Sequence, residues 1–124
     1  MKVLIFDDDM LARNDLKQIF RLHGVAAVST GDQRRALSLM AAGACNLVIA
    51  GVSQYAEGIP AFIRAARSTP GRLPIIVGAA HRAETMHLRT ISAYVDFPIF
   101  PRDLSRIVQA AVTNASTRAV SIIM

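Results

Sequence analysis

The sequence predicts a single α/β domain built on an open, doubly wound parallel sheet of five strands. Short apolar runs recur along the chain, and strands buried on both faces of a parallel sheet have this composition. Between these runs lie segments whose apolar residues repeat at helical spacing. A chain of 124 residues holds one domain of ordinary size. Strands that alternate with helices imply right-handed crossovers and parallel pairing.

The predicted elements follow one another from the N-terminus. The first strand is expected at 3–6, and the first helix at 10–23 because apolar side chains recur on one face and Gly24 follows as a left-handed end. Pro60 suits the first turn of the third helix. In chain order, the other strands are expected at 25–29, 47–50, 74–77 and 94–97, and the other helices at 32–42, 60–69, 82–92 and 104–112.

Residues 1–114 form the predicted domain, and residues 115–124 form a C-terminal tail or an extension of the last helix. The tail ends in the apolar run 120–124, which could also pack on a neighbouring molecule or precede a further domain. No basic leader precedes an apolar run, and no apolar stretch reaches the roughly 18 residues of a membrane helix. We therefore expect a cytoplasmic location and no membrane contact.

The chain carries fourteen basic and nine acidic residues, a formal charge of +5. An excess of basic residues is typical of proteins that bind nucleic acids. Here, however, the basic residues are dispersed, with Arg34 and Arg35 the only adjacent pair, and there is no tryptophan to stack on bases. Nucleic-acid binding is therefore not expected. Cys45 is the only cysteine, and its apolar surroundings favour a buried structural thiol.

Ligands of open parallel sheets bind in the crevice beyond the carboxyl ends of the strands. The residues at these ends are Asp7 and Asp8 after the first strand, Gly51 after the third, Ala79 after the fourth and Phe97 after the fifth. Only the first of these strand ends carries side chains suited to chemistry. Asp9, the next residue, is expected to face solvent at the start of the first helix, where its charge suits the helix dipole.

Four segments together resemble the receiver domain of two-component response regulators. They are the first strand with its acidic pair, the run 46–52, the run 74–80, and the run 94–99 with its proline at 98. The resemblance spans residues 2 to about 113 and implies the (βα)5 flavodoxin-like fold. It also implies an aspartate that accepts a phosphoryl group after the third strand, an acidic pair that holds Mg²⁺, a Ser or Thr after the fourth strand, and a Lys after the fifth.

Carried over position by position, the resemblance leaves the phosphorylation site incomplete. Asp7 and Asp8 match the acidic pair, but Gly51 stands at the phosphoacceptor position, Ala79 at the hydroxyl position and Phe97 at the lysine position. A shift by one residue places Ala50 or Val52 at the acceptor position, and neither has a reactive oxygen. The resemblance therefore implies a degenerate form, a pseudo-receiver, without catalytic residues or enzymatic activity.

The acidic pair remains a candidate metal site. Mg²⁺ is commonly held by one or two carboxylates and several waters, so Asp7 and Asp8 could form a weak or vestigial Mg²⁺ site; no other cofactor is expected. Their mutual repulsion requires a cation, a protonated carboxyl or a nearby base such as His81 to compensate.

The helix expected at 82–92 is shorter than is usual in this family, because only seventeen residues separate Ala79 from Phe97. Tyr94 matches the switch aromatic of receivers. Since Ala79 has no hydroxyl, the phosphate-dependent trigger for Tyr94 is missing, and we expect a static, half-buried side chain.

Arginines mark a candidate partner surface. Arg82 and Arg89 lie seven residues apart in the expected 82–92 helix, and Arg102 and Arg106 lie four apart in the last one, so each pair shares a helical face. In receivers the corresponding surface contacts partners and mediates dimers. A protein partner is therefore expected, such as a histidine kinase, a phosphotransfer protein or an output domain, and a homodimer is left open; a solvated face is the structural alternative.

Three functional hypotheses follow. The first is an atypical receiver-like signalling domain of two-component, phosphorelay regulation that acts independently of phosphorylation, through protein–protein contacts. The second is a sensor of an anionic second messenger such as a cyclic dinucleotide, bound by surface arginines, whose guanidinium groups pair with phosphates. The third is a module cut from a larger kinase or transcription regulator.

Overall fold

A computed structural model describes residues 1–68, 73–88, 91–97, 106, 109 and 121–122. Its centre is a parallel sheet with strand order β2-β1-β3-β4-β5-β6. Five of these strands match the expected ones, and the shifts at their ends are small. The strands are β1 (Lys2–Phe6), β2 (Ala26–Thr30), β3 (Leu47–Ala50), β4 (Ile75–Gly78), β5 (Ala93–Val95) and β6 (Ser121–Ile122).

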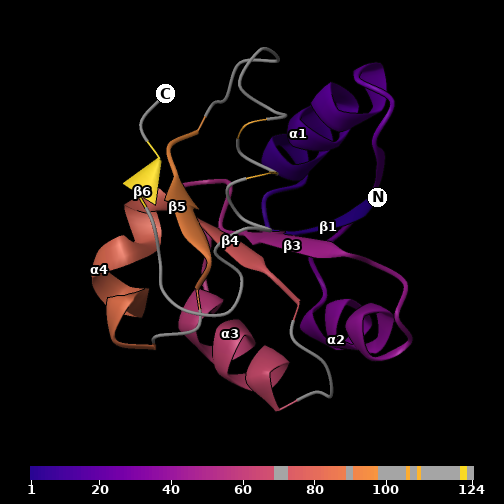
Figure 1. Ribbon diagram of the computed structural model, residues 1–124. Coiled ribbons are helices and arrows are strands. Elements are labelled where there is room, and N and C mark those ends of the chain that lie inside the picture. The colour runs from indigo at the N-terminus through magenta and orange to yellow at the C-terminus, as the bar shows by residue number, and fades with distance from the viewer. Residues whose placement is uncertain (69–72, 89–90, 98–105, 107–108, 110–120, 123–124) are drawn as a thin grey trace.

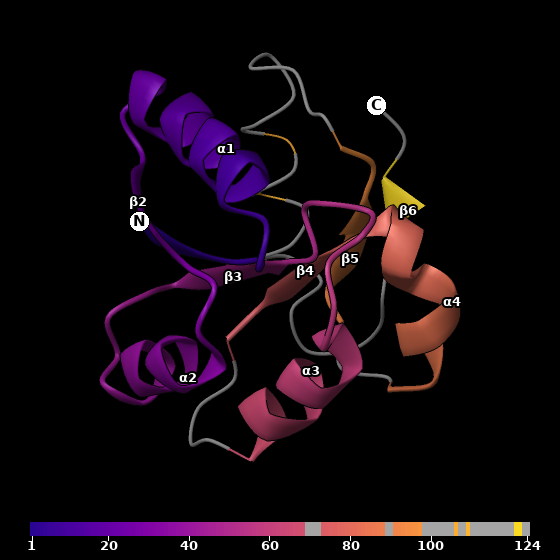
Figure 2. The ribbon, with the colours of Figure 1, turned by 180° about the vertical axis from the view of Figure 1, so that it is seen from behind.

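Helices cover both faces of the sheet, which confirms the doubly wound architecture. In Figure 1, α1 lies on one side of the sheet and α2 and α3 on the other, and the reverse view in Figure 2 agrees. The short α4 lies beside the β5 end of the sheet. The helices are α1 (Met10–Leu22), α2 (Gln33–Ala41), α3 (Ile59–Arg67) and α4 (Arg82–Thr85), with 3-10 turns η1 (Ala79–His81) and η2 (Met86–Leu88) on either side of α4.

Alternation along β1 divides the core into two layers. Val3 and Ile5 pack with Leu16 and Phe20 of α1, whereas Leu4 and Phe6 face α2 and α3. The Phe6 ring stacks on Phe62 of α3, with ring centroids 4.2 Å apart. Because both faces of each central strand are buried, these strands contain almost no polar residue.

Side-chain caps determine where the first two helices begin. The Asp9 carboxylate accepts hydrogen bonds from the amides of Leu11 and Ala12 at the start of α1. Asp32 caps α2 through the amide of Arg34. Asp9 is thus exposed at the start of the helix, as expected, and also caps it. Cys45 is buried, as predicted.

The structure departs from the sequence pattern in the region after β4. The helix expected at 82–92 is wrong in extent, because α4 ends at Thr85 and continues as the 3-10 turn η2. β5 ends at Val95, so Asp96 and Phe97 follow the strand instead of belonging to it. Ser121 and Ile122 of the tail pair in parallel with Tyr94 and Val95, a contact that the sequence pattern did not indicate. The last helix, expected at 104–112, lies mostly outside the described residues; Arg106 and Gln109 are helical.

Within the described part of the chain, no helix is both long and apolar enough to cross a membrane.

Candidate functional site

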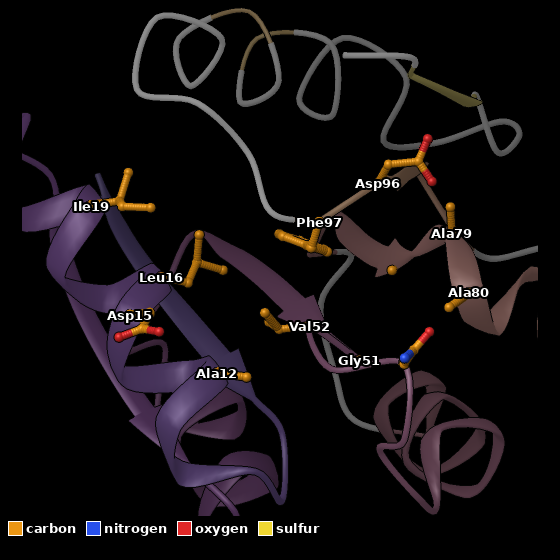
Figure 3. A pocket seen from close by; sticks show the side chains of 12 residues that line it. Ala12, Asp15, Leu16, Ile19, Gly51, Val52, Ala79, Ala80, Asp96 and Phe97 are labelled. Atoms are coloured by element: carbon orange, nitrogen blue, oxygen red, sulfur yellow. The ribbon is translucent and has the colours of Figure 1, made fainter.

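The parallel sheet brings the predicted site positions to one edge. Phe6, Ala50 and Val77 lie side by side in neighbouring strands, so the residues that follow β1, β3 and β4 meet there. The Gly51 amide donates a hydrogen bond to the Phe6 carbonyl at 3.2 Å, which ties the end of β3 to the end of β1. Figure 3 shows Gly51, Ala79 and Phe97 around the same hollow.

Asp7 is fully buried and engaged by the backbone. Its Oδ2 accepts a hydrogen bond from the Ser53 amide at 2.6 Å and its Oδ1 accepts one from the Asp9 amide at 2.7 Å. The guanidinium of Arg13 donates to the Asp7 carbonyl oxygen at 3.0 Å. Asp7 therefore holds the β3–α3 loop and the start of α1 together.

Burial raises the pKa of the Asp7 carboxyl above its usual range. The two amide hydrogen bonds lower this pKa, and the nearby carboxylate of Asp8 raises it again. A raised pKa makes the protonated form of the Asp7 carboxyl easier to reach than in solvent, which is one of the three ways to relieve the repulsion between these residues. His81 does not act as the compensating base in any described contact, because both of its ring nitrogens bond other groups.

The pair Asp7 and Asp8 fits a magnesium ion poorly. Both Asp7 oxygens already accept short amide hydrogen bonds, and Asp8 is exposed. Among the described residues, no three His, Cys, Asp or Glu side chains gather as a metal-binding group. The arrangement suits a carboxylate that organises backbone better than one that holds a cation.

Gly51 has a left-handed backbone and no room for a side chain. Its φ is +75°, a region that favours glycine. A Cβ added at this position would lie 2.6 Å from Cδ2 and 3.1 Å from Nε2 of His81. The His81 imidazole thus occupies the space into which a side chain at position 51 would project. Gly78 is equally constrained, because a Cβ there would lie only 1.9 Å from the Gly51 carbonyl oxygen.

His81 was expected only as a possible base near the acidic pair, and neither its burial nor its close packing against Gly51 was predicted. It is only 2% exposed. Its Nε2 donates to the Ser53 carbonyl at 2.8 Å, and its Nδ1 faces the Glu84 carboxylate at 2.5 Å. A carbonyl can only accept, so Nε2 carries a proton, which it donates to Ser53. Glycines at 51 and 78, with a histidine shortly after Ala79, were the available signal.

Tyr94 is held inside the domain through Thr85. Its side chain is 1% exposed, so the expectation of a half-buried ring is wrong. The Thr85 hydroxyl donates to the His81 carbonyl oxygen at 2.6 Å and lies 2.8 Å from the Tyr94 hydroxyl. Because a threonine hydroxyl has one proton, Tyr94 is the donor in the second bond. Arg82 stacks on the same ring, with Cζ 5.4 Å from its centroid. Burial raises the pKa of Tyr94 above 10.0, against the lowering effects of Thr85 and Arg82.

Gly51, Ala79 and Phe97 line a cleft of about 650 Å³ between α1 and the ends of β3, β4 and β5 (Figure 3). Its described lining is mostly apolar and includes two exposed carboxylates, Asp15 and Asp96. No arginine or lysine is among the described lining residues. Among the described lining residues there is thus no cationic partner for a phosphate, and Gly51 at the acceptor position has no side-chain oxygen to phosphorylate. The lining residues are Ala12, Asp15, Leu16, Ile19, Gly51, Val52, Gln54, Gly78, Ala79, Ala80, Asp96 and Phe97.

The structure describes two of the four arginines that form the candidate partner surface. Arg82 and Arg106 are exposed, and Arg89 and Arg102 lie outside the described residues. α4 ends at Thr85, and the expectation that Arg82 and Arg89 share a helical face stays a prediction because Arg89 is not among the described residues.

Comparison with solved structures identifies the fold. A putative response regulator from Chloroflexus aurantiacus J-10-fl superposes with a TM-score of 0.73 at 19% identity, covering 90% of this chain and 97% of the other. The chemotaxis response regulator CheY4 of Vibrio cholerae gives 0.71 at 18% identity, covering 89% and 97%. A response regulator receiver modulated diguanylate cyclase from Pelobacter carbinolicus gives 0.67 at 23% identity, covering 91% and 93%.

No family model matches the chain, and no curated protein matches it either. The chain has the CheY-like receiver fold.

Proposed function

We propose that this chain, which has the receiver fold, is a signalling domain of two-component regulation that works without accepting a phosphoryl group. The observation that carries the proposal is the His81 ring, which fills the space of a side chain at Gly51. Glycine has no oxygen to phosphorylate. The Ala79 side chain cannot donate a hydrogen bond to a phosphoryl oxygen, and the Phe97 side chain brings no positive charge.

The burial and hydrogen bonding of Tyr94 support the same proposal. Tyr94 is buried and hydrogen-bonded to Thr85 of α4, whereas the hydroxyl expected at position 79 for a phosphate-dependent switch is absent. The aromatic position is thus held by a residue that has no part in phosphoryl binding. A domain held in this way offers its partner one constant surface.

The proposed partner is a protein. One structural neighbour is the receiver domain of the hybrid histidine kinase CckA, and another is a receiver-modulated diguanylate cyclase. By analogy, we propose that this domain contacts a histidine kinase, a phosphotransfer protein or an output domain, or pairs with a second copy. The exposed side chains of Arg82 and Arg106 suit an acidic partner surface.

The test is to incubate the protein with a small-molecule phosphodonor and Mg²⁺ and to measure its intact mass. We expect the mass to stay that of the unmodified chain, while a conventional receiver in the same tube gains a phosphoryl group. A stable phosphoryl adduct on this chain would contradict the proposal. Titration with Mg²⁺ alone tests the Asp7 and Asp8 pair separately, and we expect at most weak binding.

Sensing of an anionic second messenger is the weaker proposal. Arg82 is exposed and could pair with a phosphate, but its guanidinium already stacks on Tyr94. The described cleft presents two carboxylates to a ligand, which disfavours an anion. Calorimetric titration with a cyclic dinucleotide distinguishes the two proposals.

A further inference from the structure

A continuous series of contacts runs from the end of β3 to Tyr94. Ser53, in the loop after β3, bonds the ring of His81. The backbone carbonyl of His81 bonds Thr85, and Thr85 bonds the Tyr94 hydroxyl. Every residue of this series after Ser53 is at most 2% exposed. His81 is the only member that contacts both the loop and α4.

We infer that His81 is the positioning residue that holds Tyr94 in its buried state, in place of a phosphate-dependent contact. The inference rests on the proposed function, because a domain that takes no phosphoryl group needs another means of fixing this aromatic position. It assigns to His81 a regulatory role within the same site.

The first step of the argument concerns how His81 is anchored. Its ring is bonded at both nitrogens, to Ser53 and to Glu84. Ser53 is itself fixed, because its amide donates to the buried Asp7 carboxylate at 2.6 Å. The ring also packs against Gly51 so closely that no Cβ would fit. The imidazole therefore cannot rotate without breaking several contacts at once.

The second step concerns α4, which has four residues. A helix of this length has little stability of its own. Two of its residues, Glu84 and Thr85, bond His81 through the ring and the carbonyl oxygen respectively. His81 thus fixes the position of α4 relative to the sheet.

The third step concerns the direction of the hydrogen bonds. The single proton of the Thr85 hydroxyl goes to His81, so the Thr85 oxygen is free to accept from Tyr94. Displacing the His81 backbone would release Thr85 to donate elsewhere. Tyr94 would then lose the acceptor that satisfies its buried hydroxyl, and an unsatisfied buried hydroxyl favours exposure.

The sequence offers a direct optical test. It contains two tyrosines and no tryptophan, and Tyr55 is 81% exposed. In a Tyr55→Phe background, tyrosine fluorescence reports Tyr94 alone. Acrylamide quenching of that fluorescence then measures how well Tyr94 is shielded from solvent.

We expect His81→Ala to raise the quenching constant severalfold, toward that of an exposed tyrosine, while far-UV circular dichroism still shows a folded chain. His87→Ala is the matched control, because His87 is exposed in η2 and contacts Arg64 instead of the series. Its quenching constant should equal that of the parent. A folded His81→Ala variant with unchanged quenching would overturn the inference.

Thr85→Val decides the matter if His81→Ala does not fold. Valine has nearly the shape of threonine and leaves the His81 ring contacts in place, but it removes both hydrogen bonds of the hydroxyl. We expect Tyr94 to become more accessible to acrylamide in this variant. Unchanged quenching in Thr85→Val would show that the series does not hold Tyr94.

These outcomes are separate from those of the phosphodonor experiment. A chain that gains a phosphoryl group but exposes Tyr94 in His81→Ala would refute the proposed function and keep the role of His81. A chain that takes no phosphoryl group and keeps Tyr94 shielded in the same variant would support the proposed function and refute the role of His81.

Discussion

At the scale of single residues, position 51 is restricted by two independent constraints. Its backbone is left-handed, which penalises any L side chain, and the His81 ring stands where a Cβ would project. Gly43 separates these effects, because it has a similar φ of +70° but no atom within 4 Å of an added Cβ. The two glycines form a natural pair for comparison.

We predict that Gly51→Ala destabilises the protein more than Gly43→Ala. The backbone penalty of about 1–2 kcal/mol applies to both variants. Gly51→Ala adds about 1–3 kcal/mol for forcing His81 out of its site. Urea unfolding of both variants measures the difference, and equal losses would show that the His81 ring yields at no cost.

Gly51→Asp should follow the same pattern and should take no phosphoryl group from a phosphodonor. The carboxylate would compete with His81 for space, and Ala79 and Phe97 would leave phosphoryl oxygens without partners. Efficient phosphorylation of this single variant would show that the other two positions matter less than their chemistry implies.

At the scale of elements, the start of α1 is tied to the site by Asp9. Its carboxylate caps the helix through two amides, and its own amide donates to Asp7. The cap therefore fixes the helix and the orientation of the buried carboxylate together.

We predict that Asp9→Ala lowers the free energy of unfolding by about 1 kcal/mol, the usual cost of losing an N-cap. Asp15→Ala is the control, because Asp15 is an exposed carboxylate within the same helix, and it should change stability by less than about 0.5 kcal/mol. Urea denaturation followed by circular dichroism compares the two. Equal effects would mean that the cap contributes only its charge.

Elements differ in how well the sequence predicts them. The central strands were predictable because they are buried on both faces and therefore read as apolar runs. The helix expected at 82–92 was overestimated, because its helical spacing says nothing of the contacts that His81 makes with Glu84 and Thr85. β6 was missed because a two-residue edge strand depends on its neighbour β5 and not on a pattern of its own.

From the sequence, the site could be predicted only at positions whose side chains are unreactive. Glycine, alanine and phenylalanine at three strand ends led to the prediction, from sequence alone, of a site that lacks the phosphorylation residues. The role of His81 could not be read in the same way, because it depends on the distance between the ends of β3 and β4. The exposure of Tyr94 was misjudged for the same reason, since Thr85 reaches it from another element.

At the scale of the whole molecule, the buried Asp7 carboxyl links stability to pH. Burial raises its pKa above the value of 3.8 in the unfolded chain, so the folded state holds this proton more tightly. Its contribution to the free energy of unfolding is fully present below pH 3.8 and is lost as the pH rises through the folded-state pKa.

We predict that the wild type loses stability relative to Asp7→Asn as the pH rises through this window. Asparagine has no proton to release, and the contributions of the other carboxyls largely cancel in the difference. Urea unfolding of both proteins at a series of pH values upward from 3.8 measures it. A difference that does not change with pH would contradict the raised pKa.

The close packing of Gly51 against His81 also bears on how such a domain could change over generations. An acidic residue at position 51 meets an occupied volume as long as the imidazole remains. In a lineage starting from this chain, an aspartate at 51 is therefore expected to cost less stability once His81 has been replaced. Substitution at 81 would, in turn, remove the ring contacts to Ser53 and Glu84, whereas the bond from Thr85 goes to the backbone carbonyl and does not depend on the side chain. Whichever position changes first, the first step brings a loss of stability before any gain.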